Sequence, residues 1–192
     1  MARTQAADFE QRQAAIVDRA ARLFAGSGFR GTSIADIAAA CETSKSLIYH
    51  YYPSKEDVLY AVMASHVDQL VDDVAAVRAS TEGATGRLRL LLQKFMAHYV
   101  GAADRQKVLL NELANLPPER RRTIVAKQRG IVEAVRALLI EIDPMLAADR
   151  ATAQTMLLFG AINWTHTWFD PAGALSADAI ADMALEMVAK PG

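Results

Sequence analysis

An all-α fold is the class that this sequence of 192 residues predicts. Apolar residues recur at helical spacing along nearly the whole chain, and no stretch alternates apolar and polar residues as a strand does. Breaks that contain glycine or proline separate the helical segments. Together these segments predict about nine helices and no sheet.

Three helices, two of them short, are expected before Pro53. The first apolar stripe ends at the glycines of "GSG", around Gly28, which are typical stop signals. The second helix follows Ser33, which has the spacing of a capping box with Asp36. The third helix covers "SKSLIYHYY" and ends where proline follows.

A long helix is expected from Lys55 to about Ala79, with Ser54 as its N-cap. The loop "STEGATG" follows this helix, and later breaks at "PP", "DP" and "DPAGALS" divide the rest of the chain. The further helices expected between these breaks cover residues 85–101, 104–115, 118–142, 149–169 and 177–189.

The composition is that of a soluble globular protein, with 52% hydrophobic and 22% charged residues. A net charge of −1 excludes a generally basic surface, so nucleic-acid binding would need a local cluster of donors. One cysteine, Cys41, cannot form an internal disulfide, which fits a reducing cytoplasm. The N-terminal stretch lacks the apolar core of a signal peptide, and the uncharged run 151–169 holds too many polar residues to span a membrane. We therefore expect a cytoplasmic protein without membrane contact.

The stretch "SKSLIYHYYPSKE" follows a short helix after a brief turn, which is the arrangement of a helix-turn-helix. Ile48 and Tyr52, four residues apart, are expected to face the core. Tyr49 and His50 would then point outward, toward phosphates or base edges. Hydroxyl and imidazole groups bond to phosphate without adding net positive charge, which agrees with the charge of the chain.

The first residues of this third helix are small or cationic, so its N-terminus and free N–H groups could approach a DNA groove. Leu47 could contact a thymine methyl group, and Lys55 could reach a flanking phosphate. The alternative is a helical hairpin whose aromatic rings only pack together. A metal site at His50 is not expected, because no other ligand stands at suitable spacing.

Residues 12–60, with "GFRGTSIADIAAACETSKSLIYHYYPSKEDVL", resemble the DNA-binding domain of the TetR family of bacterial transcriptional repressors. The resemblance implies a helix-turn-helix domain at residues 9–54 and a ligand-binding and dimerisation domain at residues 55–190. The DNA contacts that it implies are Thr32, Ser33, Ser44, Lys45, Ser46, Tyr49, His50 and Lys55.

Two positions depart from the family pattern. Glu42 stands at the turn position that is usually glycine, so it must adopt a positive φ or the turn must change shape. Ala35 replaces the arginine or other polar residue of many relatives, which removes one expected base contact.

The last two long helices carry apolar residues suited to a partner chain. The resemblance to the TetR family implies a homodimer that pairs through the last two helices of each chain. The small residues Gly160 and Ala161 permit close approach of another helix. The alternative is an intramolecular core. The apolar residues at helical spacing are Ala153, Met156, Leu157, Gly160, Ala161, Trp164 and Trp168, and then Ile180, Met183, Ala184, Met187 and Val188.

The segment "NWTHTWF" places two indoles four residues apart beside polar groups, which suits either a ligand wall or a dimer seam. Six cations against two glutamates lie between Pro117 and Arg136, a local excess of +4. This helix face is either ion-paired and solvated or a landing site for phosphate. The candidate ligand-binding residues are Phe95, Tyr99, Asn111, Arg121, Arg122, Asn163, Trp164 and Trp168.

A narrower resemblance, carried by "MARTQAADFEQRQ", "LIYHYYPSKE" and "NWTHTWF…GALS", is to TetR-type repressors of phenylacetate degradation and related acyl-CoA sensors. It implies a repressor that binds a palindromic operator on double-stranded DNA as a homodimer. It also implies release by a CoA thioester such as phenylacetyl-CoA, with no cofactor.

Two other functions compete with this one. A regulator of the same fold could sense a lipophilic drug or cation through Glu112 and aromatic residues. An enzyme would need a pocket with paired titratable groups around His98 or His166, and no catalytic or metal-ligating constellation is visible in the sequence.

Overall fold

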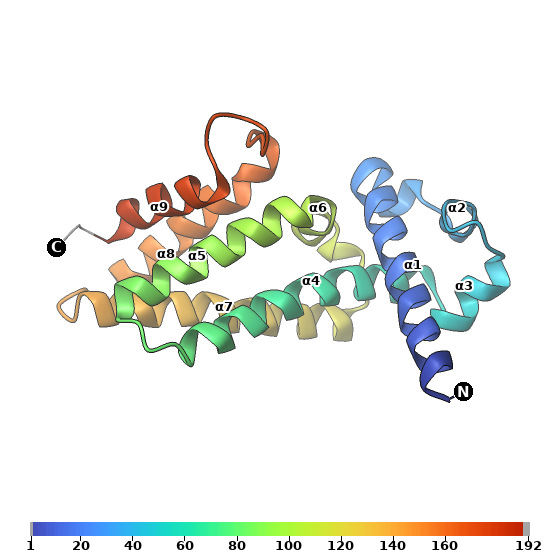
Figure 1. The fold of residues 1–192 in the computed structure, drawn as a ribbon, viewed down its shortest axis with the longest axis horizontal. Helices are drawn as coiled ribbons and strands as arrows, with labels where there is room; N and C mark the ends of the chain where they lie inside the picture. The colour runs from blue at the N-terminus through green and yellow to red at the C-terminus, as the bar shows by residue number, and fades with distance from the viewer. Residues whose placement is uncertain (1, 190–192) are drawn as a thin grey trace. The chain divides into compact units, whose positions relative to one another are not determined.

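The computed structural model describes residues 2–189, and within this range the side chains from residue 9 onward. These residues form nine α-helices and two 3-10 turns without a strand, as predicted (Figure 1). The elements are α1 (Ala2–Gly31), α2 (Ile34–Ala40), α3 (Lys45–Tyr51), α4 (Lys55–Arg78), α5 (Ala84–Gly101), α6 (Ala103–Asn111), η1 (Leu113–Asn115), α7 (Pro118–Ile142), α8 (Ala148–Trp164), η2 (Thr165–Thr167) and α9 (Ala177–Val188).

The glycine and the capping residues predicted to end or begin helices do so at the predicted positions. Gly28 has a φ of 73° and a ψ of 166°, which interrupts α1 at the expected stop. The hydroxyl of Ser33 accepts a hydrogen bond from the Asp36 N–H at 3.2 Å, and Asp36 Oδ2 accepts one from the Ser33 N–H at 2.8 Å. This reciprocal pair is the predicted capping box, and it lowers the pKa of Asp36.

Two helices end earlier than the sequence pattern suggests. Helix α8 stops at Trp164, and residues 165–167 form a 3-10 turn instead of a continuation to residue 169. Helix α6 likewise stops at Asn111 before the 3-10 turn of residues 113–115. In the first case the Thr165 hydroxyl donates to the Ile162 carbonyl at 2.6 Å, a local bond that competes with the regular helix ladder.

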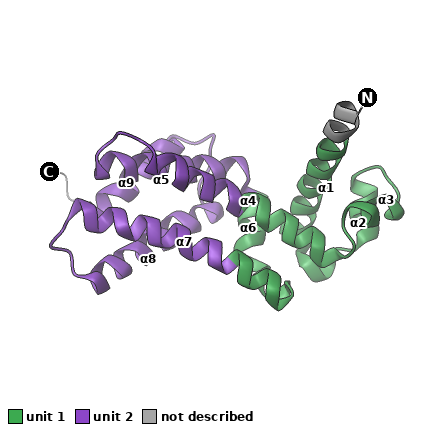
Figure 2. Cartoon of the chain, turned by 90° about the horizontal axis from the view of Figure 1, so that it is seen from below, with its two compact units in different colours: residues 1–66, 104–124 green, residues 67–103, 125–192 purple. Residues whose placement is uncertain are grey.

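The chain divides into two compact units (Figure 2). Unit 1 contains residues 1–66 and 104–124, and unit 2 contains residues 67–103 and 125–192. The expected domain boundary after residue 54 remains a prediction about function, and its far limit, residue 190, lies outside the described residues. Unit 1 adds to the predicted DNA-binding helices the first half of α4, then α6 and the first turns of α7.

The core of unit 1 lies between α1, α2 and α3. Phe24, Ile37 and Ile48 are fully buried there, and the rings of Phe24 and Phe29 lie 5.7 Å apart. Helix α3 rests on α1 through a second aromatic contact, because the ring centroids of Phe9 and Tyr51 are 4.6 Å apart. A small aromatic core therefore holds α3 in place.

The core of unit 2 is built from α5 with its neighbours. Helix α9 lies along α5 and α8 (Figure 1). Arg89 of α5 donates two hydrogen bonds, of 2.7 and 2.6 Å, to the Asp182 carboxylate of α9.

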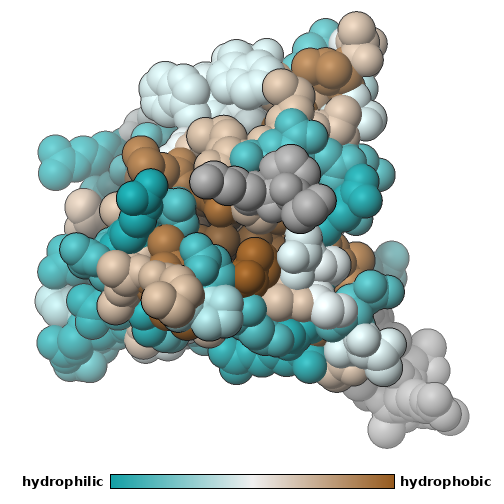
Figure 3. All heavy atoms as spheres, turned by 90° about the vertical axis from the view of Figure 1, so that its left-hand side faces the viewer, coloured by the Kyte–Doolittle hydropathy of each residue, from teal (hydrophilic) through white to brown (hydrophobic). Residues whose placement is uncertain are grey.

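The end of this unit where α4 and α7 finish and α5 begins shows hydrophobic atoms set among hydrophilic ones (Figure 3). Within residues 2–189, no helix is both long and apolar enough to cross a bilayer.

Candidate nucleic-acid interface and ligand cavities

Helix α3 separates its inward and outward residues as the sequence predicts. Ile48 is completely buried and Tyr52 is 6% exposed, whereas Tyr49 is 51% exposed. Burial raises the pKa of the Tyr52 phenol. His50 also faces solvent, and its ring meets the Tyr51 ring edge-on at 5.5 Å. One tyrosine thus anchors α3 in the core, one packs on α1, and one remains outside.

The N-terminus of α3 is capped by Ser44, whose hydroxyl accepts from the Leu47 N–H at 3.2 Å. Ser44, Lys45 and Ser46 are all exposed. Small exposed residues leave the first free N–H groups of the helix accessible, and these groups together with the lysine charge attract anions. The exposed end of α3 is therefore chemically suited to phosphate and base-edge contacts.

The turn between α2 and α3 keeps its usual geometry although it has no glycine. Glu42 adopts a φ of 52°, a left-handed conformation that costs a residue with a side chain about 1 kcal/mol. The Thr43 N–H donates to Ala38 O at 2.9 Å and the Glu42 N–H donates to Ala39 O at 3.1 Å. These two bonds form the Schellman motif that ends α2. The first of the two predicted outcomes for Glu42 is therefore the one observed.

In two of the predicted DNA contacts, Thr32 and Lys55, the polar end of the side chain is bonded to backbone carbonyls of unit 1. Thr32 is 2% exposed, and its hydroxyl donates to the Gly28 carbonyl at 2.9 Å. The Lys55 ammonium donates to the carbonyls of Phe29 and Thr32, both at 2.7 Å, and lies 4.1 Å from the centre of the Phe29 ring. Both side chains hold the end of α1 in this structure. Their roles as DNA contacts remain predictions.

A cavity of about 400 Å³ opens beside the turn of the helix-turn-helix. Arg12 and Arg19 of α1 line one side, and Cys41 and Thr43 of the turn line the other. Burial raises the pKa of the Cys41 thiol, and the nearby Arg19 opposes this effect. The arginines add positive charge close to the start of α3, and their place beside this turn is not evident from their positions in the sequence.

Residues 104–124 are held to the DNA-binding helices by ion pairs. Arg105 of α6 pairs with Asp18 of α1, and Arg120 of α7 pairs with Asp57 of α4. The Arg120 guanidinium also lies 4.8 Å from the centre of the Tyr60 ring. These contacts link α6 and the start of α7 to α1 and α4 within unit 1.

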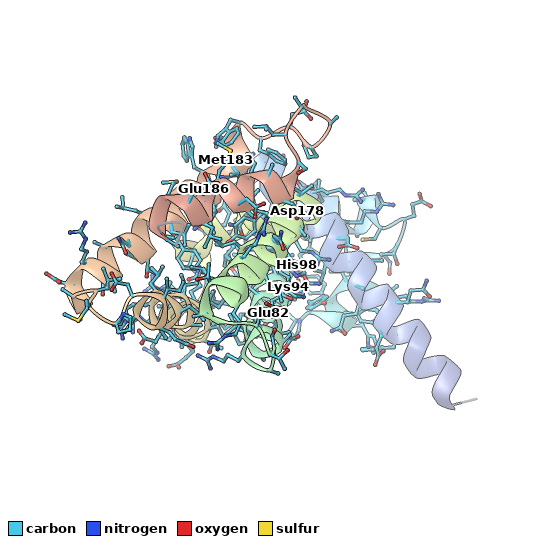
Figure 4. All side chains as sticks on the ribbon, turned by 60° about the vertical axis from the view of Figure 1, so that its left-hand side comes forward. Glu82, Lys94, His98, Asp178, Met183 and Glu186 are labelled. Atoms are coloured by element: carbon cyan, nitrogen blue, oxygen red, sulfur yellow. The ribbon has the colours of Figure 1, made fainter. Side chains whose placement is uncertain are left out.

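The predicted apolar stripe of α8 is exposed. Met156, Leu157 and Trp164 are 56%, 68% and 64% exposed. On α9 the stripe divides: Ile180 and Ala184 are buried within unit 2, whereas Met183 and Met187 are 53% and 63% exposed. Figure 4 shows Met183 on the outward side of α9, near Glu186. The apolar face is here defined as Met156, Leu157, Trp164, Met183 and Met187.

The structure does not gather the predicted ligand residues into one site. Phe95 and Tyr99 are buried on α5, with ring centroids 6.4 Å apart. Trp164 and Trp168 are largely exposed, and Asn163 lies next to them with its carbonyl 2.6 Å from His166 Nδ1. Trp168 lies beyond the end of α8, so it does not continue the helical stripe as predicted.

The remaining predicted ligand residues belong to unit 1. Asn111, Arg121 and Arg122 are exposed, and Asn111 donates to the Lys107 carbonyl at 2.9 Å. None of the eight predicted ligand residues lines the cavity beside the helix-turn-helix or the two cavities of unit 2, all three of which are formed by residues that the structure describes. Their role in ligand binding therefore remains a prediction.

Most of the basic cluster of α7 is ion-paired. Arg120, Arg122, Lys127 and Arg136 pair with Asp57, Glu119, Asp68 and Glu133. Arg136 makes two hydrogen bonds to Glu133, of 2.8 and 2.6 Å, which lower the pKa of that glutamate. Only Arg121 and Arg129 make no ion pair with a described residue. The ion-paired alternative thus accounts for four of the six cations.

The residues named for the two competing functions also have structural partners. Glu112 accepts a hydrogen bond from the Asn115 amide at 2.7 Å and lies beside Gly28. His98 Nε2 lies 2.7 Å from an oxygen of Asp73, whose other oxygen accepts from Lys94 at 3.0 Å. Lys94 and His98 are seen together on α5 in Figure 4. Neither His98 nor His166 lines the cavity beside the helix-turn-helix or either of the two cavities of unit 2 given below.

Two further cavities are lined by described residues of unit 2. One of about 590 Å³ lies at the corner between α7 and α8, where Leu139, Leu146, Arg150 and Gln154 contribute to its walls. A smaller one of about 180 Å³ lies between α4, α5 and α7. Neither was predicted: the walls of the smaller cavity come from helices far apart in the chain, and the larger one depends on how α7 and α8 turn at residues 143–147 and on the end of α9.

The chain matches two family models. Residues 16–62 match the bacterial regulatory proteins of the tetR family, and residues 81–191 match the tetracyclin repressor-like C-terminal domain. The first match covers the helix-turn-helix and the start of α4. The second covers more than half of the chain.

Individual proteins are similar over nearly the whole length. A TetR-family transcriptional regulator from Bordetella parapertussis 12822 is 40% identical, covers 93% of this chain and 94% of its own, and superposes with a TM-score of 0.87. AibR, solved in complex with isovaleryl coenzyme A and operator DNA, is 29% identical and covers 94% of this chain and all of its own, with a TM-score of 0.82. The transcriptional repressor KstR2 of Rhodococcus jostii strain RHA1 is 23% identical over 92% of this chain and 89% of its own.

Proposed function

This chain belongs to the TetR family of bacterial regulatory proteins, and on that premise we propose that it is a homodimeric repressor released from its operator by a CoA thioester. The observation that carries the proposal is the outward face of α3, where Ser44, Lys45, Ser46, Tyr49 and His50 are exposed around a buried Ile48.

DNA binding follows from the chemistry of that face. Lys45 supplies charge, the serines let the helix end approach closely, and Tyr49 and His50 supply hydrogen-bonding groups for phosphates or bases. Arg12 and Arg19 add cations on α1 beside the same turn. A chain with a net charge of −1 can bind a polyanion in this way because its cations are concentrated locally.

Dimerisation is supported by the apolar face of α8 and α9. Large apolar side chains exposed on two neighbouring helices are unfavourable in water and typical of interfaces. The two half-sites of a palindromic operator are contacted together only when a symmetric pair of chains holds two α3 helices at the matching spacing. The same face thereby becomes a requirement for operator affinity.

The effector class is supported by AibR, which was solved with isovaleryl coenzyme A and operator DNA. A thioester that binds better to the state unable to span both half-sites lowers DNA affinity by its differential binding. Residues 104–124 offer a route for this effect, since Arg105 and Arg120 tie α6 and α7 to the DNA-binding helices.

The test begins with a duplex selected from a random pool by the purified dimer, and binding is measured by fluorescence anisotropy. We expect Lys45→Ala with Tyr49→Ala to weaken binding by about tenfold or more, because each removes one of the proposed contacts. Lys107→Ala, which removes the same charge from the exposed face of α6, is the control and should change binding little. Unchanged binding by the α3 variant would remove the proposed interface.

The effector is tested on the same complex. Phenylacetyl-CoA and isovaleryl-CoA are expected to weaken operator binding by about tenfold, and free CoA by much less, because the acyl group distinguishes the two states. If neither thioester changes DNA affinity, the effector is of another class, whereas the DNA-binding proposal stands.

A further inference from the structure

The smaller cavity of unit 2 has an apolar floor formed by three helices. Val77 of α4 and Leu91 of α5 are each only 1% exposed, and Ala134 and Leu138 of α7 complete the floor at 4% and 7%. Its lining residues come from the end of α4, the first half of α5 and the second half of α7. It does not include Phe95, Tyr99 or any other residue predicted to bind the CoA thioester.

The walls of this cavity carry two arginines and one glutamate: Arg78, Arg87 and Glu141. Arg78 makes no ion pair with a described residue, and Arg87 pairs with Glu141 through one terminal nitrogen. The remaining charge is therefore positive. A second anion could be accommodated beside Arg78 and Arg87.

Arg87 also has an unused hydrogen-bond donor. Its Nε is buried and has no acceptor among the described residues. Buried donors in folded proteins nearly always have an acceptor, and because Arg87 Nε has none, no internal bond at this nitrogen fixes the orientation of the guanidinium. A rotation of the side chain would turn Nε and a terminal nitrogen side by side toward a carboxylate in the cavity, which is the edge that a planar carboxylate fits.

The two partners of the existing ion pair differ in freedom. The Arg87 side chain is 19% exposed, whereas that of Glu141 is 54% exposed. Glu141 can therefore turn toward solvent when a ligand carboxylate arrives, while the buried Arg87 stays in position. Because one partner of this ion pair is exposed to solvent, the pair contributes little to stability, and its exchange for a ligand carboxylate would lower stability little.

The size of the cavity limits the ligand. About 180 Å³ is well below the roughly 300–1,000 Å³ of sites for drug-sized molecules, so a CoA thioester does not fit. We propose that this cavity binds a small organic monocarboxylate with a compact apolar tail, whose carboxylate contacts Arg87 and Arg78 and whose tail lies against Val77 and Leu91. The site is separate from the proposed effector function and does not depend on it.

The first experiment measures binding to the full-length protein without DNA or CoA. Benzoate, phenylacetate and hexanoate are titrated by calorimetry and by ligand-observed NMR, with benzamide and phenylacetamide as neutral matches. At least one acid is expected to bind about tenfold more tightly than its amide, because only the carboxylate pairs with the guanidinium. No binding of any acid up to about 10 mM, or equal binding of acid and amide, would overturn the proposal, since ligands with so few atoms bind in the millimolar range.

Variants locate the bound acid. Arg87→Met should weaken the acid by about tenfold or more, and Ala137→Phe should do the same by filling the mouth of the cavity while leaving every charge in place. Arg89→Met is the matched control, because Arg89 lies on the same helix but holds Asp182 and does not line the cavity.

Ala137→Phe keeps the proposal testable if Arg87→Met fails to fold, because Ala137 is exposed and tolerates a larger side chain. Acid binding that survives Ala137→Phe, or that is lost equally in Arg89→Met, would place the acid elsewhere. Operator binding is not part of this measurement, so failure here leaves the proposed function intact.

Discussion

The outward face of α3 and the apolar face of α8 and α9 both expose aromatic rings, but the neighbours of those rings differ. Tyr49 is 51% exposed and carries a hydroxyl, with Lys45 one helical turn before it and His50 next to it in the chain. Trp164 is 64% exposed on the same helix as Met156 and Leu157, which have no charge to offer. Exposure alone therefore does not identify a partner. The outward face of α3 suits a polyanion, and the apolar face suits an apolar surface of a partner chain, because burial removes both apolar surfaces from water.

The comparison also separates two kinds of lysine. Lys45 is exposed at the start of α3, whereas the Lys55 ammonium is held by two backbone carbonyls. Both belong to the same basic stretch of sequence. Only one of them is available to a duplex in this structure.

The largest effect is expected at the apolar face. Leu157→Asp places a charge on a surface proposed to be buried in the dimer, and should raise the dimer dissociation constant by at least about 100-fold, or roughly 3 kcal/mol. Sedimentation equilibrium measures this change directly. Leu175→Asp is the control, because Leu175 is also exposed, at 47%, but lies in the loop before α9 and outside this face. Equal dimerisation of the two variants would show that the apolar face has another partner.

The next effect distinguishes the two lysines. Lys55→Met removes two charge-assisted hydrogen bonds at the end of α1 and should lower the free energy of unfolding by about 2 kcal/mol, measured by urea denaturation. Lys45→Met should leave that free energy nearly unchanged.

Operator binding should respond to Lys45→Met in a specific manner. Loss of one phosphate contact weakens binding to all sequences similarly and reduces the slope of log affinity against log salt by about 1. If Lys45→Met destabilises the fold as much as Lys55→Met, the division between an exposed and a structural lysine is wrong.

A smaller gain in stability is expected at the turn that positions α3. Glu42→Gly should raise the free energy of unfolding by about 1 kcal/mol, because glycine adopts a φ of 52° without the penalty of a side chain. Glu42→Ala removes the carboxylate but keeps the Cβ, so thermal unfolding of both variants separates charge from backbone strain. A gain in both variants would attribute the effect to charge.

The smallest effect concerns the pair between α5 and α9. Arg89 lowers the pKa of Asp182 below its ordinary value of 3.8. A lowered folded-state pKa stabilises the fold above the unfolded-state pKa, and this contribution is lost as the pH falls through the folded-state pKa. The difference in unfolding free energy between the native protein and Asp182→Asn should therefore be constant near neutral pH and vanish in acid.

Glu186→Gln is the reference for that measurement. It removes a carboxylate from the same helix, on which Glu186 is labelled in Figure 4. Among the described residues, Asp182 of this helix has an ion-pair partner and Glu186 has none. Its stability relative to the native protein should change little with pH. The same acid dependence in both variants would mean that net charge, and not the pair with Arg89, is responsible.

Local sequence determined much of the helix-turn-helix. The alternation of inward Ile48 with outward Tyr49, the capping box of Ser33 and the break at Gly28 all depend on residues within four positions of one another. Backbone sterics and helix geometry fix such features wherever the segment lies. The positive φ of Glu42 was one of two outcomes compatible with the sequence, and the structure shows it together with the two bonds that end α2.

Long-range partners could not be read in the same way. The charges of Arg120 and Lys127 suggested a phosphate site, but Asp57 and Asp68, about sixty residues earlier, pair with them. Lys55 is predicted to contact a phosphate, and the structure adds bonds from its ammonium to the Phe29 and Thr32 carbonyls that the sequence did not reveal. In each case the sequence shows the charge of the side chain, but the group that this charge contacts depends on which helices become neighbours.

By itself, then, the sequence determined the helical class, the caps and the face of α3 that is free to meet DNA, because these follow from periods of three to four residues. The tertiary structure alone decided which charges are neutralised, which half of the α9 stripe stays exposed and where cavities open. Those properties arise between helices, and the free energy of an ion pair, an apolar contact or a void depends on atoms that the chain brings together only when it folds.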